Sequence, residues 1–223
     1  MPGKNIVKVY IEGGYYHIYN RGIDKRNIFL DEQDCKVFLH YLKIYLSPKE
    51  ELLKLSQTNI KILRYIKFNL HDEIDLMSFT LMPNHFHLQV KQYTKEGIIK
   101  LTRRVVTSYV MYFNDKYKRK GGLFESIYKA ALIDNDSYLL HLSRYIHLNC
   151  RELLSHKINF QEFSSYHYYL GKKQASWLKP QEILKYFKTA KNRFKNIFSY
   201  KSFVEDYLDD SGLILGSLTL EED

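Results

Sequence analysis

The chain has 223 residues, of which 45% are hydrophobic and 26% charged, with a formal net charge of +9. This length allows one sizeable core with a small appendage. No apolar run is long enough to span a bilayer, and the first residues lack the apolar core of a signal peptide. Two cysteines, Cys35 and Cys150, exclude a disulfide framework and a cysteine-based zinc site. We therefore expect a globular cytoplasmic protein, and the sequence pI of about 9.2 makes nucleic acid a candidate partner.

Periodicity and turn residues predict an antiparallel sheet covered by helices, an α+β fold. Residues 60–66 fit either a helix or a strand. The composition shifts after Leu170, so we expect one domain over 1–170 and a helical C-terminal extension over 171–223. In chain order, the expected elements are a strand over 15–20, a helix over 31–46, a strand pair over 74–82 and 85–91, a helix over 97–117, a strand over 124–133, a helix from 135 or 136 to 149, and a helix over 180–198.

His85 and His87 flank Phe86 in a short strand that follows a Pro-Asn turn. Side chains alternate across a strand, so both imidazoles point to one face. Two adjacent imidazoles make half of a divalent-metal site. The alternative is two unrelated histidines, one of them a core residue, and the spacing alone does not decide between the two.

Tyr145 and Asn149 are four residues apart on the last helix of the domain, hence neighbours on its surface. They lie beside an apolar stripe of Leu139, Leu142, Ile146 and Cys150. A phenol and a carboxamide at the edge of a buried face can both reach a shared site. The alternative is a partly buried Tyr and an Asn near the helix end, and these residues alone favour it.

Positive charge is concentrated in residues 91–130, which hold ten Lys or Arg and three acidic residues, a net +7. Such a cluster displaces counterions from a phosphate backbone, although many lysine runs are only solvated helix faces. The 20 tyrosines and 13 phenylalanines add surfaces on which unpaired bases stack, although most of these rings belong to a core. These features favour DNA as the partner.

Five segments in this order resemble the single-tyrosine HUH transposases of the insertion-sequence and REP-associated kind. They are YHIYNRG (16–22), LMPNHFHL (81–88), GLFESIYK (122–129), RYIHLN (144–149) and FSSY (163–166). The resemblance runs from about Tyr15 to Leu170. Two departures are visible: Cys150 stands where the family usually has Pro, and Ile127 where it often has Arg, which removes one DNA contact.

The resemblance implies a ferredoxin-like fold with the histidine pair on a central strand. It implies that His85, His87 and Asn149 bind a divalent metal, for which two nitrogens and one carbonyl oxygen favour Mg²⁺ or Mn²⁺. Tyr145 would then attack a DNA phosphodiester and form a 5′-phosphotyrosine with a free 3′-hydroxyl. The substrate would be single-stranded or hairpin DNA, handled in the bacterial cytoplasm at the nucleoid.

We expect DNA to lie along a groove formed by the loop 21–26 and the basic segment. The expected contacts are Arg21, Arg26, Arg103, Arg104, Lys118, Arg119, Lys120, Lys129 and Arg144. Phosphate contacts of this kind set affinity rather than sequence preference.

Two other functions remain open. One is a domesticated DNA-binding protein with the same fold and no catalysis, and the other is an unrelated metal-dependent phosphodiesterase that uses water. The sequence also leaves open a monomer or a homodimer, and Tyr145 acting within its own chain or across a dimer.

Overall fold

The computed structural model describes residues 10–149, 157–188 and 199–206. The core elements follow the order βαββαβ: β1 (Tyr15–Arg21), α1 (Glu32–Leu46), β2 (Ile74–Met82), β3 (His85–Gln92), α4 (Gly97–Lys116) and β4 (Lys129–Ile133). Smaller elements between α1 and β2 are α2 (Lys49–Ser56), η2 (Ile60–Ile62) and α3 (Leu63–Ile66). After β4 come α5 (Asp136–Leu148), η4 (Phe160–Phe163), α6 (Tyr166–Tyr169), α7 (Gln181–Lys188) and α8 (Tyr200–Glu205).

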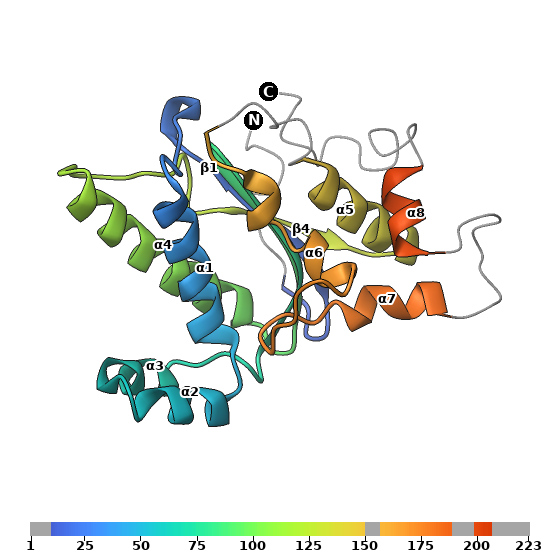
Figure 1. Ribbon diagram of the computed structural model, residues 1–223, viewed down its shortest axis with the longest axis horizontal. Helices are drawn as coiled ribbons and strands as arrows, with labels where there is room; N and C mark the ends of the chain where they lie inside the picture. The colour runs from blue at the N-terminus through green and yellow to red at the C-terminus, as the bar shows by residue number, and fades with distance from the viewer. Residues whose placement is uncertain (1–9, 150–156, 189–198, 207–223) are drawn as a thin grey trace.

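The four strands form one antiparallel sheet in the order β2-β3-β1-β4. This order, together with the βαββαβ sequence of elements, confirms the expected ferredoxin-like fold, with the histidine pair on a central strand. The sheet separates two helical layers: α1 and α4 lie on one side, and α5, α7 and α8 on the other (Figure 1).

The face toward α1 and α4 carries the main apolar core. Ile18 of β1 and Phe86 and Leu88 of β3 point to this side. They pack with Phe38 of α1 and Tyr109 of α4, whose rings lie edge to face at 5.2 Å. The alternating apolar positions of the strands and the helical spacing on both helices together account for this layer.

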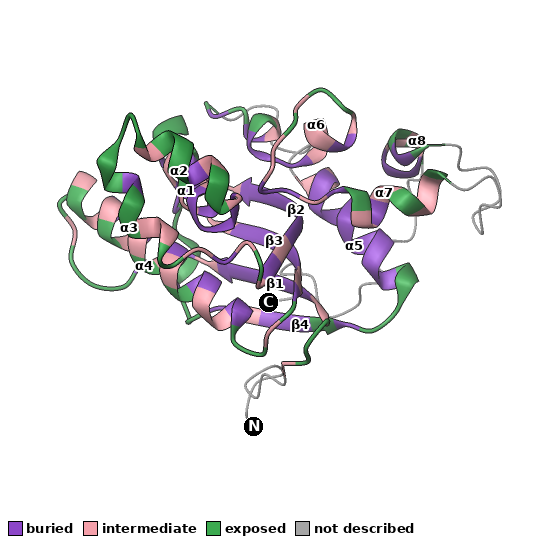
Figure 2. Ribbon diagram, turned by 90° about the horizontal axis from the view of Figure 1, so that it is seen from below, coloured by how far each residue is buried: buried purple, intermediate pink, exposed green. Residues whose placement is uncertain are grey.

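The opposite face of the sheet is polar and yet buried. His17, Thr80, His87 and Gln89 point to this side, and none of the four side chains is exposed to solvent. Helix α5 covers them with a second apolar cluster that includes Leu139, Leu142 and Ile146, and residues of α7 and α8 pack behind it. Figure 2 shows the strands and most of α5 as buried.

The structure corrects one predicted strand and settles one ambiguous segment. The strand expected over 124–133 begins only at Lys129, and of the residues before it Phe124 forms an isolated antiparallel bridge with Gly22. There the Asn20 side chain donates to the carbonyls of Ser126 and Ile127. Residues 60–66 are helical, as η2 and α3.

The C-terminal extension is described only in part. Its predicted helix over 180–198 is observed as α7, and the remainder of that range lies outside the described residues, as does Cys150. Residue Lys179 donates its N–H to the Leu76 carbonyl, so the segment before α7 runs along the edge of β2. No helix among the described residues is long and apolar enough to cross a membrane.

One buried carboxylate joins α1 to α4. Asp34 is fully buried and accepts hydrogen bonds from Tyr112 at 2.9 Å, Tyr117 at 2.8 Å and Lys116 at 2.8 Å, all on or just after α4. It also accepts from the Leu30 N–H, and it completes a capping box with Asp31 at the start of α1. A buried charge with this many donors holds the two helices in one register.

We expect Asp34→Asn to lower the free energy of unfolding by about 2 kcal/mol, because a neutral amide leaves buried donors without an acceptor. Urea unfolding followed by circular dichroism would measure this. Glu32→Gln is the matched control: its ion pair with Lys36 on the same helix is exposed, so the change should stay within about 0.5 kcal/mol. Equal losses for both variants would contradict a structural role for the buried carboxylate.

Candidate active site

The histidine pair lies at the end of the sheet where β2 turns into β3. In the strand register, His85 is opposite Arg21 of β1 and Met82 of β2, while His87 is opposite Tyr19 and Thr80. The two imidazole rings share the polar face, with centroids 4.9 Å apart. The predicted placement of both histidines on one face of a strand is therefore confirmed.

The hydrogen bonds of Asn84 fix the tautomer of His85. The amide Nδ2 of Asn84 donates to the Lys25 carbonyl at 3.2 Å, which identifies the other end of this side chain as its oxygen. That oxygen lies 2.6 Å from His85 Nδ1. Because a carboxamide oxygen only accepts, Nδ1 carries the proton, and the lone pair of the neutral ring is on Nε2.

His87 is more deeply placed than its neighbour. Its Nδ1 lies 2.8 Å from Nε2 of His17, on the adjacent strand β1. Its Nε2 has no hydrogen-bond partner among the described residues, and the same holds for Thr80 Oγ1 directly across from it on β2. Buried polar atoms are almost always paired, so atoms of this kind mark a position where a ligand is expected.

Burial keeps these imidazoles neutral. It lowers the pKa of His17 to about 3 and, with a smaller contribution from the Arg21 guanidinium, that of His85 to about 4. The pKa of His87 lies well below its ordinary value, first because of burial and then because of its two histidine neighbours. Neutral imidazoles are the form that binds metal.

Helix α5 brings Tyr145 to the histidines of its own chain. The Tyr145 ring meets the His87 ring edge to face with centroids 5.5 Å apart, and the Tyr145 side chain is 8% exposed. Asn149 ends the helix one turn later, where its N–H donates to the Tyr145 carbonyl. These two side chains therefore lie on the same side of α5, as the sequence predicts.

Polar contacts fix α5 near both of its ends, one directly to the sheet and one through Ser165, which bonds the backbone of Phe79 on β2. Gln89 of β3 donates to the Leu139 carbonyl at 2.7 Å, and Ser78 of β2 fixes that amide by donating to its oxygen. Near the other end of the helix, His147 is hydrogen-bonded through Nε2 to Ser165 and through Nδ1 to Tyr200 of α8, both at 2.7 Å. Tyr145 lies between these two contacts along the helix.

Sequence reasoning did not select His17, Gln89 or His147, although all three are buried at or near the site. His17 and His147 fall inside the segments that carry the family resemblance. The available signal was the alternation of β1, which puts His17, Tyr19 and Arg21 on one face. The partners of each residue depend on the strand register, which the sequence does not show.

The predicted basic residues do not form a single groove. Arg21 and Lys129 flank the histidines: Arg21 pairs with Glu125 at 2.9 Å, and the Lys129 ammonium lies 5.7 Å from the centre of the Tyr19 ring. Arg103 and Arg104 lie on α4, in the helical layer on the other side of the sheet. They therefore do not share a surface with the histidine pair.

Of the remaining predicted DNA contacts, those in loops are exposed or partly exposed, whereas Arg144 is buried. Arg26 and Lys118–Lys120 lie at loops after β1 and α4, and Arg119 is tied locally to the Asn114 side chain. Arg144 is 1% exposed and its guanidinium lies over the Phe203 ring of α8, so its prediction as a DNA contact is wrong for this conformation.

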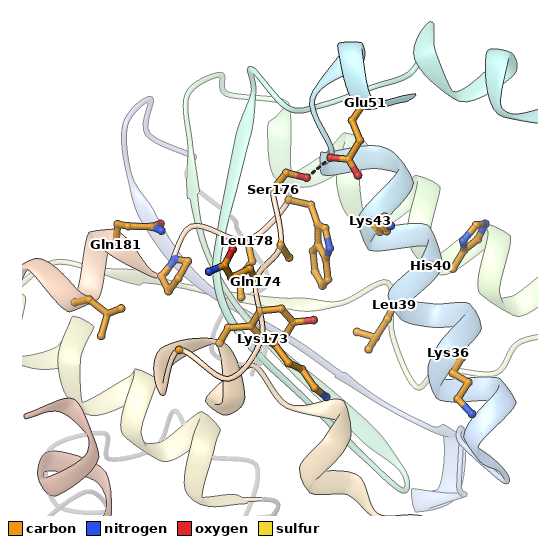
Figure 3. Close-up of a pocket in the computed structure, with 16 residues that line it drawn as sticks. Lys36, Leu39, His40, Lys43, Glu51, Lys173, Gln174, Ser176, Leu178 and Gln181 are labelled. Atoms are coloured by element: carbon orange, nitrogen blue, oxygen red, sulfur yellow. Dashed lines mark hydrogen bonds between the residues drawn. The ribbon is translucent and has the colours of Figure 1, made fainter. Parts of the chain in front are cut away.

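A separate cavity of about 1120 Å³ lies beyond the edge of β2, between α1 and the segment that leads into α7 (Figure 3). Lys36, His40 and Lys43 of α1 line this cavity together with Lys173 and Gln174. A hydrogen bond from Ser176 to Glu51 closes one end. None of the candidate catalytic residues lines this cavity.

The donors at the histidine pair fit a divalent metal. Both ring Nδ1 atoms are engaged elsewhere, the Nε2 atom of His87 has no partner, and Asn149 offers a neutral oxygen. No group of three or more His, Cys, Asp or Glu side chains in the described part of the chain is arranged to hold a metal ion. Two imidazoles leave coordination positions open, which an oxygen such as that of Asn149 would suit.

A family model described as "Transposase IS200 like" matches residues 36–149, just over half of the chain. The chain belongs to this transposase family. The match includes His85, His87, Tyr145 and Asn149, and it begins after β1. Curated proteins gave no significant match. A solved structure of a REP-associated tyrosine transposase bound to a REP hairpin is similar with a TM-score of 0.48 and 14% identity, over 79% of this chain and 92% of that one.

The buried histidines predict acid sensitivity. Burial also lowers the pKa of His147 to about 3. The unfolded chain binds a proton at each such histidine near pH 6.5, whereas the folded protein does not, so the free energy of unfolding falls as the pH drops below 6.5. The slope should reach about 1.4 kcal/mol per pH unit for each of His17, His85, His87 and His147.

Urea unfolding at pH 7.5, 6.5, 5.5 and 5.0 would measure this slope. His147→Gln should reduce the slope by the share of one histidine, because Gln does not titrate. A free energy of unfolding that is constant from pH 7 to pH 5 would contradict neutral buried imidazoles.

Proposed function

We propose that this transposase cleaves and rejoins single-stranded DNA with Tyr145 as its nucleophile. The observation that carries the proposal is the contact between the Tyr145 ring and the His87 ring on the polar sheet face. It combines a nucleophile, two neutral imidazoles and nearby cations within one chain. Membership of the IS200-like transposase family supports DNA as the substrate.

The proposed reaction begins with attack of the Tyr145 hydroxyl on a DNA phosphorus. The new bond joins the Tyr145 oxygen to the phosphorus of the 5′-phosphate while the bond from that phosphorus to the 3′-oxygen breaks. The phenol gives up its proton and the leaving 3′-oxygen takes up one, so the other strand end carries a free 3′-hydroxyl. Because the phosphotyrosine conserves the energy of the ester, a 3′-hydroxyl can later attack it and reseal DNA without ATP. Breakage and rejoining in this way is strand transfer rather than hydrolysis.

The residues of the site have separate tasks. His85, His87 and Asn149 would hold Mg²⁺ or Mn²⁺, which polarises the scissile phosphate when bound. Arg21 and Lys129 would bind the phosphates on either side, since they flank the histidines. Gln89 and His147 hold α5 so that Tyr145 stays against the sheet.

Tyr145 acts within its own chain in this proposal. Only Asp134 and Asn135 separate β4 from α5, and the Asn135 side chain caps the helix by accepting from the Tyr138 N–H at 2.7 Å. Packing of α8 against the outer side of α5 supports the same arrangement. A monomer is therefore sufficient for cleavage.

The substrate is proposed to be unpaired at the cleaved bond, as in a single strand or beside a hairpin. The hairpin preference follows the family resemblance. An unpaired strand allows its phosphate to reach a tyrosine that is largely covered by the sheet and helix.

Tyr145→Phe should abolish the covalent protein–DNA adduct while leaving the free energy of unfolding nearly unchanged, because only one oxygen is removed. The measurement is a denaturing gel with a labelled hairpin oligonucleotide and Mn²⁺. Tyr138→Phe is the matched control: it lies on the same helix, is equally buried, and should retain the adduct.

The same assay separates the three functional hypotheses. Adduct formation that requires metal and is lost in EDTA supports the transposase. Cleavage without an adduct would indicate hydrolysis by water, and binding without cleavage would indicate a domesticated protein. An adduct that persists in Tyr145→Phe would overturn the assignment of the nucleophile.

Lys129→Gln should weaken binding to every single-stranded DNA and lower the slope of log K against log salt by about 0.7. Arg103→Gln removes the same charge from the far helical layer and should leave the slope unchanged. Fluorescence anisotropy over a salt series would compare the two variants. Equal changes in slope would place DNA on both faces of the sheet.

A further inference from the structure

His17 lies outside the matched family segment and contacts the candidate metal ligand His87 directly. It lies on β1, it is fully buried, and its ring stacks on the His87 ring at 5.0 Å with an interplanar angle of 22°. Its Nε2 lies 2.8 Å from His87 Nδ1. In the strand register His17 is opposite Gln89, so it reaches His87 diagonally.

A hydrogen bond between two imidazoles requires one N–H and one lone pair. If His17 donates, the proton of neutral His87 is on Nε2, which then points an N–H into the site and cannot bind a metal. If His87 donates, its Nε2 carries the lone pair. The direction of this single bond therefore decides what His87 can do.

The other histidine of the pair supplies an internal comparison. His85 donates its Nδ1 proton to Asn84, whose orientation is fixed by Lys25, so its lone pair is on Nε2. Each histidine thus has a partner at Nδ1, and the same direction of donation would give both rings the same tautomer. Metal-binding histidines commonly have their second ring nitrogen fixed in this way.

We propose that His17 is a positioning residue that accepts a hydrogen bond from Nδ1 of His87 and so keeps the Nε2 lone pair of His87 available to a divalent cation. This inference rests on the proposed function, which supplies the cation. His17 itself is not a ligand, because its Nε2 is already used by His87 and no three-histidine metal cluster is present in the described residues.

The stacking around His17 fixes the direction in which its Nε2 points. The Tyr19 ring lies 4.7 Å from the His17 ring, and the His87 ring lies 5.0 Å from it. A ring held by two such contacts and fully buried loses little further freedom when it accepts the bond. Positioning is therefore built into β1 before any cation binds.

The first test is the tautomer of His87 in the metal-free protein. Two-dimensional ¹⁵N–¹H NMR of protein labelled at histidine distinguishes a ring protonated at Nδ1 from one protonated at Nε2. We expect His87 to be protonated at Nδ1. Protonation at Nε2 would overturn the proposal, and this measurement needs no substitution.

The second test uses two variants of His17. His17→Phe keeps a buried ring but removes the acceptor, whereas His17→Gln retains an acceptor oxygen near the position of Nε2. We expect His17→Phe to weaken Mn²⁺ binding 10- to 100-fold, measured by electron paramagnetic resonance of free Mn²⁺, and to move the His87 proton to Nε2. His17→Gln should restore both within a few-fold.

Asn84→Ala serves as the matched comparison, because it should alter the tautomer of His85 and leave that of His87 unchanged. Equal Mn²⁺ affinity in His17→Phe and wild type would overturn the positioning role. A wild-type protein that binds no Mn²⁺ while His87 is protonated at Nδ1 would instead overturn the metal role in the proposed function, and with it the purpose assigned to His17.

Discussion

The structure depends on burying a polar face of its central sheet. Leaving a buried polar group without a partner costs about 1–3 kcal/mol, so each group on this face requires a specific hydrogen bond. Gln89 meets the requirement by bonding Ser78 on one side and the helix α5 on the other. The covering helix is therefore fixed by direction-dependent contacts rather than by apolar packing alone.

This constraint explains why Tyr145, the proposed nucleophile, has a well-defined position. An apolar helix face on an apolar sheet tolerates small shifts, because dispersion contacts are non-directional. Hydrogen bonds at 2.7 Å from Gln89 and to His147 do not tolerate such shifts. Tyr145 lies between Leu139 and His147 on α5. The bonds that satisfy the buried polar groups therefore also set the distance between Tyr145 and His87. Helix α8 adds to this through Tyr200, which connects His147 to Ser143.

The sequence predicted those parts of the site that depend on periodicity within one element. Alternation put His85 and His87 on one strand face, and the spacing of four put Tyr145 and Asn149 on one helix side; both placements are observed. It did not predict contacts between elements. Arg144 was predicted to contact DNA, but it is buried, with its guanidinium over the Phe203 ring of α8.

Similar reasons account for the other differences. Arg103 and Lys129 belong to the same basic segment of the sequence, but Arg103 lies on α4, on the other side of the sheet from the histidines. The number of charges in a segment does not show which side of a sheet each residue lies on. The strand expected from residue 124 begins only at Lys129, because the Asn20 side chain donates hydrogen bonds to two carbonyls of the preceding segment. Such side-chain competition with the strand ladder is a tertiary effect that propensity does not include.

Not every buried polar atom on this sheet face has a hydrogen-bond partner among the described residues. His17 Nδ1, Thr80 Oγ1 and His87 Nε2 are buried polar atoms for which the described residues provide no partner, and all three belong to neighbouring positions on three adjacent strands. Folding alone does not favour such a group, since apolar residues of similar size would avoid its cost. The stability lost here is supplied by the well-bonded groups around it, and exceptions of this kind concentrate at functional sites. The proposed chemistry of Tyr145 therefore lies beside the few atoms of this polar face that have no partner among the described residues.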